Sequence, residues 1–338
     1  MITAGIDAGA ATTKVLLFRD REIIGYRINS TAFDFLSTAR HMFEELLANG
    51  DIRREDVGKV YATGYGRNSI SFADKSISEI TAHAKGVSFL FPEVRGIIDV
   101  GGQDSKVIVI ENGKVEDFLM NDKCAAGTGK FLEYTAKALE VPINDLGNLA
   151  LASSHPAGIT SMCTVFAESE VISLRARGIT KEDIAAGLIT SIAQRVVVMA
   201  KRMGLKERIA FVGGVAKNAG MKAALEKELG VTLYVPFEPQ ITGALGAAIA
   251  AQGPVSPPHQ RTKGMSIFVF LPDIFPARLC QRVIDPVPPA LPLDKPALLE
   301  NGQMIGEFRA GDMHELVDDA HTERLVAEKV EDLKTERV

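Results

Sequence analysis

The sequence has few cysteines, no excess of positive charge and no long apolar run, and each lack excludes a class of protein. Three cysteines in 338 residues do not make a disulfide framework, so a reducing, cytoplasmic compartment is expected. The net charge of −5 argues against a nucleic acid or an anionic membrane as partner. No apolar run approaches the ~20 residues of a membrane-spanning helix. No signal peptide is expected either, because no basic segment followed by an apolar run opens the chain.

What is present fits a globular protein of about two domains. Of the 338 residues, 46% are hydrophobic and 24% charged, and a domain typically holds ~150 residues. Patterns typical of strands alternate with patterns typical of helices as far as Gly253, which predicts an α/β fold. The expected strands are Glu22–Ile28, Val57–Thr63, Lys114–Leu119 and Arg208–Val212; the expected helices are Phe35–Leu47, Glu79–Phe91, Thr128–Glu140, Phe166–Arg177, Ile184–Met203 and Gly243–Ala251.

The composition changes after Gly253. Ten of the 15 prolines lie beyond this residue, which is typical of an extended linker. Asp312–Arg337 is a charged run with apolar residues at helical spacing, so a terminal helix is expected there. It is interpreted as a solvated appendage, with docking on a partner as the alternative. Cys280, the lone thiol in this region, is interpreted as an incidental reduced cysteine.

An internal repeat lies in the first third of the chain. The segment "GIDAGAATTKVLLF" (Gly5–Phe18) aligns without a gap on "IIDVGGQDSKVIVI" (Ile97–Ile110). Each copy reads as a β-hairpin whose glycine-bearing turn lets backbone amides approach a phosphate. A pair of such hairpins indicates a duplicated domain with a ligand between the halves, whereas two unrelated hairpins of similar composition are the alternative. The alignment places Asp7 on Asp99, Gly9 on Gly101, Thr13 on Ser105 and Lys14 on Lys106.

Three glycine-rich turns are candidates for one nucleotide site. They are the first phosphate turn (Gly9–Lys14), the second phosphate turn (Gly101–Asp104) and the third turn (Gly213–Gly214), which is expected to open a helix whose N-terminus faces the ligand. The candidate nucleotide contacts are Gly9, Ala10, Ala11, Thr12, Thr13, Lys14, Gly101, Gly102, Gly213, Gly214, Lys217, Asn218, Gln240 and Gly243.

Four further polar side chains are candidates for catalysis. Asp7 and Asp99 each end a strand beside a phosphate turn, which suits a magnesium ion held partly through waters. Taken singly, each is better explained as a cap that bonds nearby amides, but their equivalent places in the repeat favour the metal role. Gln103 and Asp104 follow the second phosphate turn directly and are the best placed to orient water, although neither is assigned as a base.

The stretch "NDKCAAGTGKF" (Asn121–Phe131) has the Gly129-Lys130 pair of a Walker A loop but lacks its first glycine and its hydroxyl residue. Cys124 stands in front of this helix start, and Cys163 precedes another. Neither lies in a CxxC pair, and two thiolates cannot complete a zinc or cubane site alone. A symmetric dimer would supply four. A pair of buried thiols that pack as small hydrophobic groups is the alternative.

Two resemblances make this reading specific. "GIDAGAATTK", "IIDVGGQDSK" and "FVGGVAKN" resemble the phosphate and adenosine motifs of the actin, sugar-kinase and chaperone-ATPase fold. This likeness implies two ribonuclease H-like domains with ATP in the cleft. The first would cover residues 1–95 and be joined by a returning helix at 241–251. The second would cover 96–240 and carry the cysteines, leaving 253–338 as an extension.

The motifs "ATGYGRNSI", "EITAHAKG", "NDKCAAGTGKF" and "CTVFAESEVIS" resemble the activators of 2-hydroxyacyl-CoA dehydratases, in a family shared with benzoyl-CoA reductase ATPase subunits. The likeness runs from Met1 to about Ala251. It implies a homodimer sharing one [4Fe-4S] cluster, held by Cys124 and Cys163 of each chain, besides ATP/ADP and Mg²⁺. The implied partners are ferredoxin or flavodoxin as electron donor and an acyl-CoA dehydratase or reductase as acceptor.

Two other readings stay open on the sequence. A small-molecule kinase of the same fold explains the ATP motifs but gives the cysteines no task. An ATP-dependent interaction protein of chaperone type would use the terminal segment to bind a partner. His83, on a helix with apolar neighbours, is expected to be packed rather than catalytic.

Overall fold

The computed structural model describes residues 1–121, 124–160, 164–253, 298–299 and 303–304, and the chain divides into two compact units, Met1–Ala277 and Arg278–Val338. In the second unit the described residues are two short antiparallel strands, β10 (Leu298–Leu299) and β11 (Gln303–Met304). Cys163, Cys280 and the terminal helix expected at 312–337 lie outside the described residues.

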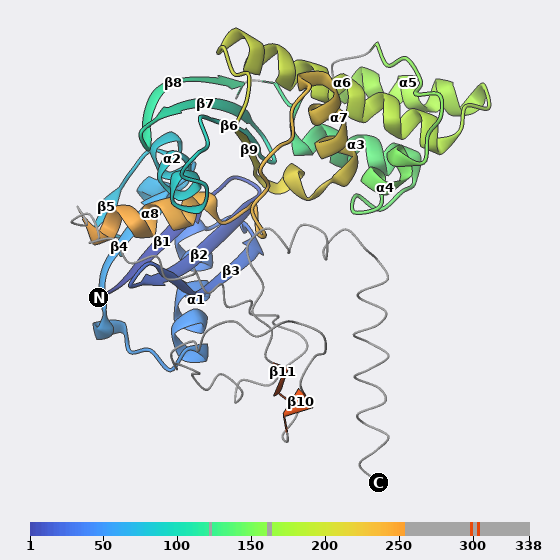
Figure 1. The fold of residues 1–338 in the computed structure, drawn as a ribbon. Coiled ribbons are helices and arrows are strands. Elements are labelled where there is room, and N and C mark those ends of the chain that lie inside the picture. Colours follow the sequence, from blue (N-terminus) through green and yellow to red (C-terminus); the bar gives the residue numbers. More distant parts are fainter. Residues whose placement is uncertain (122–123, 161–163, 254–297, 300–302, 305–338) are drawn as a thin grey trace. The chain divides into compact units, whose positions relative to one another are not determined.

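The first unit contains a five-stranded sheet near the N-terminus (Figure 1). Its central strand carries Asp7 and is buried along its whole length, with an antiparallel neighbour on one side and a parallel neighbour on the other. In spatial order the strands are β3 (Glu22–Ser30), β2 (Thr12–Arg19), β1 (Ile2–Ala8), β4 (Val57–Thr63) and β5 (Lys75–Ser76).

A four-stranded sheet repeats this arrangement. In spatial order its strands are β8 (Lys114–Asn121), β7 (Ser105–Glu111), β6 (Gly96–Val100) and β9 (Ile209–Val212). An antiparallel meander of three strands is again joined by one parallel strand. The two hairpins expected from the internal repeat are confirmed, and both sheets have the same order and strand directions.

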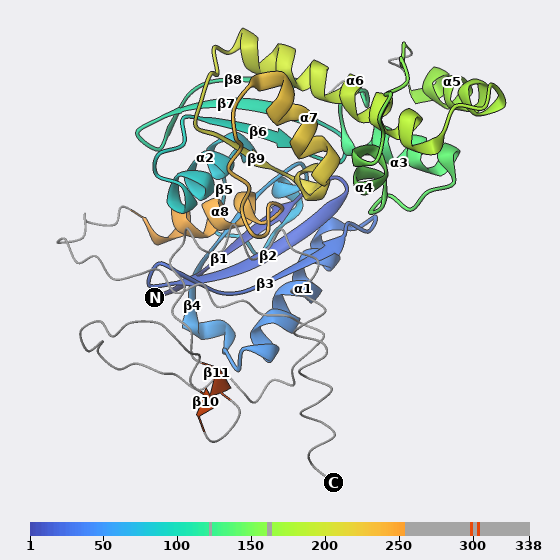
Figure 2. The same ribbon diagram turned by 45° about the vertical axis from the view of Figure 1, so that its right-hand side comes forward.

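Eight α-helices lie among the described residues, and most begin within a few residues of their expected positions. They are α1 (Phe35–Asn49), α2 (Glu79–Leu90), α3 (Gly129–Leu139), α4 (Leu146–Leu151), α5 (Thr164–Ala176), α6 (Lys181–Arg202), α7 (Ala219–Leu229) and α8 (Thr242–Gln252). Figure 2 shows α3 to α7 gathered beside the second sheet. There Leu188, Ile192 and Val196 of α6 are at most 2% exposed within the largest apolar core.

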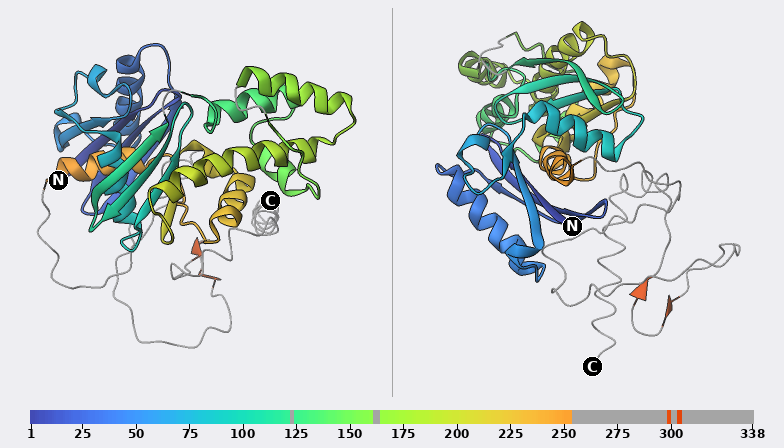
Figure 3. Two further views of the ribbon diagram at one scale, coloured as in Figure 1. Left: turned by 90° about the horizontal axis from the view of Figure 1, so that it is seen from above. Right: turned by 90° about the vertical axis from the view of Figure 1, so that its left-hand side faces the viewer.

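Helix α8 packs against the first sheet and against α2 at the same time (Figure 3). A Cβ atom on Gly5 of β1 would lie 1.8 Å from Ala244 O, and one on Gly246 of α8 would lie 1.7 Å from Ala82 O of α2. Only glycine permits such close approach of backbones. Helix α8 thus forms a layer between β1 and α2.

Helix α6 is long and apolar enough to cross a membrane, contrary to the expectation that no apolar run approaches that length. However, 61% of its most apolar window is buried inside the protein. Because burial in a core accounts for its composition, α6 is weak evidence for a membrane span.

Candidate functional site

Each phosphate turn stands beside an aspartate paired with a lysine of the same hairpin. Lys14 lies across from Asp7 on β2, and its Nζ is 3.0 Å from Asp7 Oδ2. Lys106 lies across from Asp99 on β7, and its Nζ is 3.3 Å from Asp99 Oδ2. Both carboxylates are buried. In each hairpin the aspartate therefore forms an ion pair with a lysine. The repeat alignment had already placed these two lysines, Lys14 and Lys106, on each other.

Lys106 binds more than one carboxylate. Its Nζ also lies 2.7 Å from Asp104 Oδ1 and 3.5 Å from Glu79 Oε2. Glu79 stands at the start of α2, which Ser78 caps by accepting a hydrogen bond from Thr81 N. Asp104 is thus held by Lys106, whereas Gln103, the other candidate beside the turn, is exposed.

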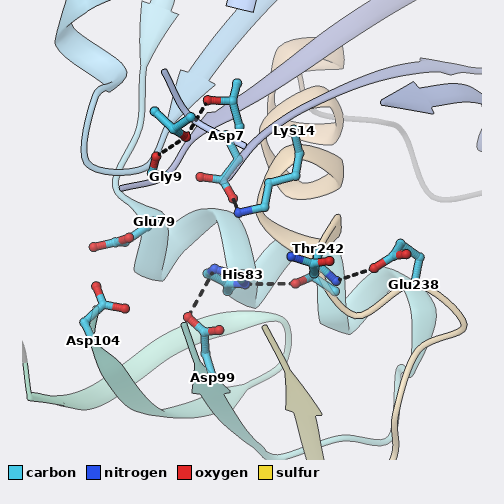
Figure 4. A network of polar contacts seen from close by, with 12 residues as sticks. Asp7, Gly9, Lys14, Glu79, His83, Asp99, Asp104, Glu238 and Thr242 are labelled. Atoms are coloured by element: carbon cyan, nitrogen blue, oxygen red, sulfur yellow. Dashed lines mark hydrogen bonds and ion pairs between the residues drawn. The ribbon is translucent and has the colours of Figure 1, made fainter. Parts of the chain in front are cut away.

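His83 connects this network to α8. It lies one turn after Glu79 on α2, and its Nε2 is 3.5 Å from Asp99 Oδ2. Its Nδ1 shares a hydrogen bond of 2.9 Å with Thr242 Oγ1 at the start of α8 (Figure 4). The prediction that His83 is packed is confirmed by its burial, but the residue is also hydrogen-bonded beside a catalytic candidate.

Burial and pairing shift three pKa values in this network. Burial alone would lower the pKa of Lys106, but Asp99, Glu79 and Asp104 outweigh it, so the pKa is raised and the lysine stays cationic. Burial would raise the pKa of Asp99, but His83 and Lys106 hold it below the usual value. For Glu79 burial wins over the attraction of Lys106, and its pKa is raised above 4.5. Glu79 therefore accepts a proton more readily than an ordinary glutamate.

The two phosphate turns meet at Ala11 and Gly102. A Cβ atom on Gly102 would lie 2.5 Å from Ala11 Cβ, so no side chain fits between the turns. The hydroxyl of Thr13, a candidate nucleotide contact, shares a 2.9 Å hydrogen bond with Thr31 Oγ1. Ala10 and Thr12 are half-buried on the first turn, and Ala11 is exposed. What the turns offer a ligand is mainly backbone.

The third turn lies against Asp99. Gly213 has φ +88°, and a Cβ atom there would lie 2.4 Å from Asp99 Oδ1, so only glycine fits. The helix that opens at this turn is short. A 3₁₀ turn, η3 (Gly214–Lys217), follows it, and α7 begins only at Ala219 because Asn218 caps that helix by accepting from Met221 N at 2.9 Å.

The remaining candidate nucleotide contacts, Lys217, Gln240 and Gly243, lie near the third turn or near Asp7. Lys217 forms an ion pair with Glu238 at 2.7 Å. Gln240 is half-buried, 3.4 Å from where a Cβ atom of Gly214 would lie. A Cβ atom on Gly243 would be 3.2 Å from Asp7 Oδ2. The three turns thus converge around the two aspartates, as expected for one ligand site.

Sequence reasoning gave no role to Glu79 or Lys106 in this site, and it did not single out Gly64. Gly64 has φ +85°, and a Cβ atom there would lie 2.4 Å from Asp7 Oδ1. A signal was present for Lys106, which aligns with Lys14 in the repeat. For Glu79 no local signal existed, because only the position of α2 brings it to the second phosphate turn.

Cys124 is exposed, on a loop between β8 and α3. Lys130 does not act like a Walker lysine, since its Nζ binds Glu133 at 2.9 Å on the surface. Among the described residues, no three or more His, Cys, Asp or Glu side chains are grouped to hold a metal ion. The one cysteine among the described residues is thus an exposed thiol.

Comparison with known proteins agrees with this geometry. Residues 4–251 match the model of the BadF/BadG/BcrA/BcrD ATPase family. The (R)-2-hydroxyglutaryl-CoA dehydratase activating ATPase of Acidaminococcus fermentans is 46% identical over 251 residues, which cover 74% of this chain and 96% of that protein. The solved activator of the 2-hydroxyisocaproyl-CoA dehydratase from Clostridium difficile, with bound ADPNP, has a TM-score of 0.71 at 45% identity, covering 74% of this chain and 94% of that one.

The fold extends to sugar kinases. A glucokinase of the ROK family from Streptomyces griseus has a TM-score of 0.50 at 14% identity, covering 75% of this chain and 99% of that one. This likeness shows the fold alone, and it agrees with the expected α/β fold of actin and the sugar kinases. The family match covers most of the chain, and it includes all three turns and Cys124. The chain therefore belongs to the BadF/BadG/BcrA/BcrD ATPase family.

Proposed function

We propose that this chain is an ATP-hydrolysing iron–sulfur electron donor that activates a 2-hydroxyacyl-CoA dehydratase or a related acyl-CoA reductase in the cytoplasm. The observation that carries the proposal is an exposed Cys124 on the loop before α3, a helix whose first amides bond the second phosphate turn, in a chain whose relatives are named dehydratase activators. A kinase of the same fold has no use for that thiol.

In this proposal the three turns bind ATP through backbone amides. Asp7 and Asp99 would bind waters of a Mg²⁺ ion, which would supply charge neutralisation at the phosphates. Glu79 is placed to accept a proton from the attacking water, because its raised pKa and its position beside the second phosphate turn suit a base. We propose this role for Glu79 in preference to Asp104, whose carboxylate binds Lys106 at 2.7 Å.

Cys124 and Cys163 of two chains would hold one [4Fe-4S] cluster, which supplies one-electron transfer between ferredoxin or flavodoxin and the dehydratase. The two proposed domains, 1–95 with the helix 241–251 and 96–240, would each contribute one phosphate turn. A change in their separation would then reach the dimer interface.

Hydrolysis is needed because nucleotide binding alone can shift the reduction potential of the cluster only a little. Coupling between two sites is typically ~1–3 kcal/mol, and for one electron ~1.4 kcal/mol corresponds to about 59 mV. Binding therefore shifts a cluster potential by only ~40–130 mV. A larger drive requires a committed step in the partner complex. Electron transfer to the dehydratase that runs equally well with ADP and with ATP would contradict this account.

The proposal is tested by purification without oxygen, followed by iron analysis and a visible spectrum. A brown dimer with about one cubane per two chains is expected. The Cys124→Ser variant should lose the iron, and Cys280→Ser, a thiol outside the family match, should keep it. A colourless, iron-free dimer would exclude the electron-donor function and favour a kinase.

A further inference from the structure

Helix α3 starts on the second phosphate turn. The backbone amides of Gly129 and Lys130 donate to the carbonyl oxygens of Gly101 and Gly102, at 2.8 Å each. Amides in the first turn of a helix have no partner within the helix, so these bonds satisfy two of them. The nucleotide turn and the helix that follows Cys124 are thus joined by two backbone hydrogen bonds.

The junction is closely packed. A Cβ atom on Gly129 would lie 3.1 Å from Gly101 O and 3.2 Å from Val215 Cγ2. Val215 belongs to η3, so the start of α3 touches the elements of two of the three turns. Because packed groups do not compress, a displacement of the second phosphate turn is passed to α3.

Two side chains tie the loop of Cys124 to the same hairpin. Ser105 and Asn121 are paired across β7 and β8. The Oγ of Ser105, which is 1% exposed, donates to Gly127 O. Asn121 Nδ2 donates to Cys124 O at 3.2 Å and to Ala126 O at 3.0 Å. The loop is held by its carbonyls, and the thiol is left exposed.

The corresponding hydrogen bonds in the first repeat are different. Thr13 occupies the place of Ser105, but its hydroxyl bonds Thr31, which in turn donates to Gly9 O at 2.7 Å. In the first repeat the hydroxyl of Thr13 is thus linked through Thr31 to the first phosphate turn. In the second repeat the hydroxyl of Ser105 bonds the loop of Cys124.

We propose that Ser105 and Asn121 are positioning residues that transmit the nucleotide state from the second phosphate turn to Cys124. The turn, the paired strand residues, the cysteine loop and the start of α3 form one hydrogen-bonded unit, so the thiol moves with the turn. The inference rests on the proposed function in one respect: the moved thiol is taken as a cluster ligand.

The test uses the full-length protein without its cluster, with ADP or with ADPNP. Hydrogen exchange of the peptide covering 124–131 and the alkylation rate of Cys124 are both measured by mass spectrometry. In the wild type each should differ between the two nucleotides by ~5-fold or more, the lower end of typical site coupling. In the Ser105→Ala/Asn121→Ala double variant the difference should fall below ~2-fold while the nucleotide Kd changes little. An unchanged difference overturns the proposal, and Asn121→Ala alone gives the same reading if the double variant does not fold.

Thr135→Ala is the matched control. It also removes a buried hydroxyl, but one whose bonds, to Phe131 O at 2.9 Å and Leu132 O at 3.2 Å, lie inside α3. The Thr135→Ala variant should keep the wild-type difference between the two nucleotides. Loss of this difference in Thr135→Ala would show a general loosening of α3 and would overturn the proposal. The iron content distinguishes the electron-donor function from the coupling of nucleotide state to Cys124. A protein that binds no iron but shows the nucleotide-dependent difference would contradict only the electron-donor function. A protein that binds iron but shows no such difference would contradict only the coupling.

Discussion

Lys106 is the cation that lets three carboxylates stand together at the second phosphate turn. Its side chain is 3% exposed, and it binds Asp99, Asp104 and Glu79. Lys14, its counterpart in the first repeat, binds Asp7. The additional partners of Lys106 are Asp104, on the second phosphate turn, and Glu79, on α2. More charged side chains therefore meet at the second phosphate turn than at the Lys14–Asp7 pair. Lys106 is the residue that contacts all three carboxylates.

Lys106→Met is expected to lower the free energy of unfolding by about 3–5 kcal/mol, because it leaves buried carboxylates without their cation. Denaturant unfolding measures the change. Lys130→Met removes another ion-paired lysine, but its pair with Glu133 is on the surface, so its cost should stay below ~1 kcal/mol. Equal losses in the two variants would show that the buried network adds nothing to stability.

Glu79→Gln is expected to slow ATP hydrolysis by ~10²–10⁴-fold with little change in nucleotide affinity, the typical loss when a general base is removed. The ionised carboxylate is the active form, and burial raises its pKa above 4.5. Wild-type hydrolysis should therefore fall as the pH drops through that raised pKa, and the residual rate of the variant should lack this step.

Asp104→Asn serves as the comparison for Glu79, because both carboxylates contact Lys106. Its effect on hydrolysis should be much smaller, since Asp104 is already held in a 2.7 Å ion pair. The reverse ranking of the two variants would assign the base to Asp104, one of the two residues that the sequence alone placed best.

At the scale of elements, the sequence was most informative where structure is local. The hairpins β1–β2 and β6–β7 follow from alternating apolar residues and a duplicated turn, and α1, α3 and α6 from helical spacing. At the third turn the sequence did not separate the short helix η3 from α7, whose N-cap is Asn218. The contact of α2 with Lys106 was not predictable, since it depends on how helices far apart in sequence pack. The roles of Glu79 and His83 come entirely from that packing.

The crossing of α2 and α8 gives a prediction at this scale. Gly246→Ala should destabilise the protein by at least ~1–3 kcal/mol, because the added Cβ atom would lie 1.7 Å from Ala82 O and must push two helix backbones apart. Thermal unfolding tests it. Gly158→Ala, at a glycine with open space within 4 Å, should change stability little. A similar shift in both variants would mean that the crossing tolerates separation.

At the scale of the whole molecule, the part of the chain that matches the family lies before Gly253. The family match ends at residue 251. The Acidaminococcus fermentans relative is covered over 96% of its own length by 74% of this chain. Thr3 Oγ1 donates to Ala248 O at 2.9 Å, so the first strand and the last helix of this part are bonded to each other. Both ends of the matched region therefore belong to one core.

Two truncations test where that core ends. A chain of residues 1–253 should fold, bind nucleotide and hydrolyse ATP like the full chain, because α8 is complete and its Ala244, Leu245 and Ala248 fill the space against β1 and β2. A chain ending at Gln240 should not fold, because loss of α8 exposes the buried faces of β1 and α2 at once. Circular dichroism and ATPase assays measure both. A 1–253 chain that folds but loses dehydratase activation would assign the segment after Gly253 to partner binding, and one that fails to fold would show that the core extends beyond the family match.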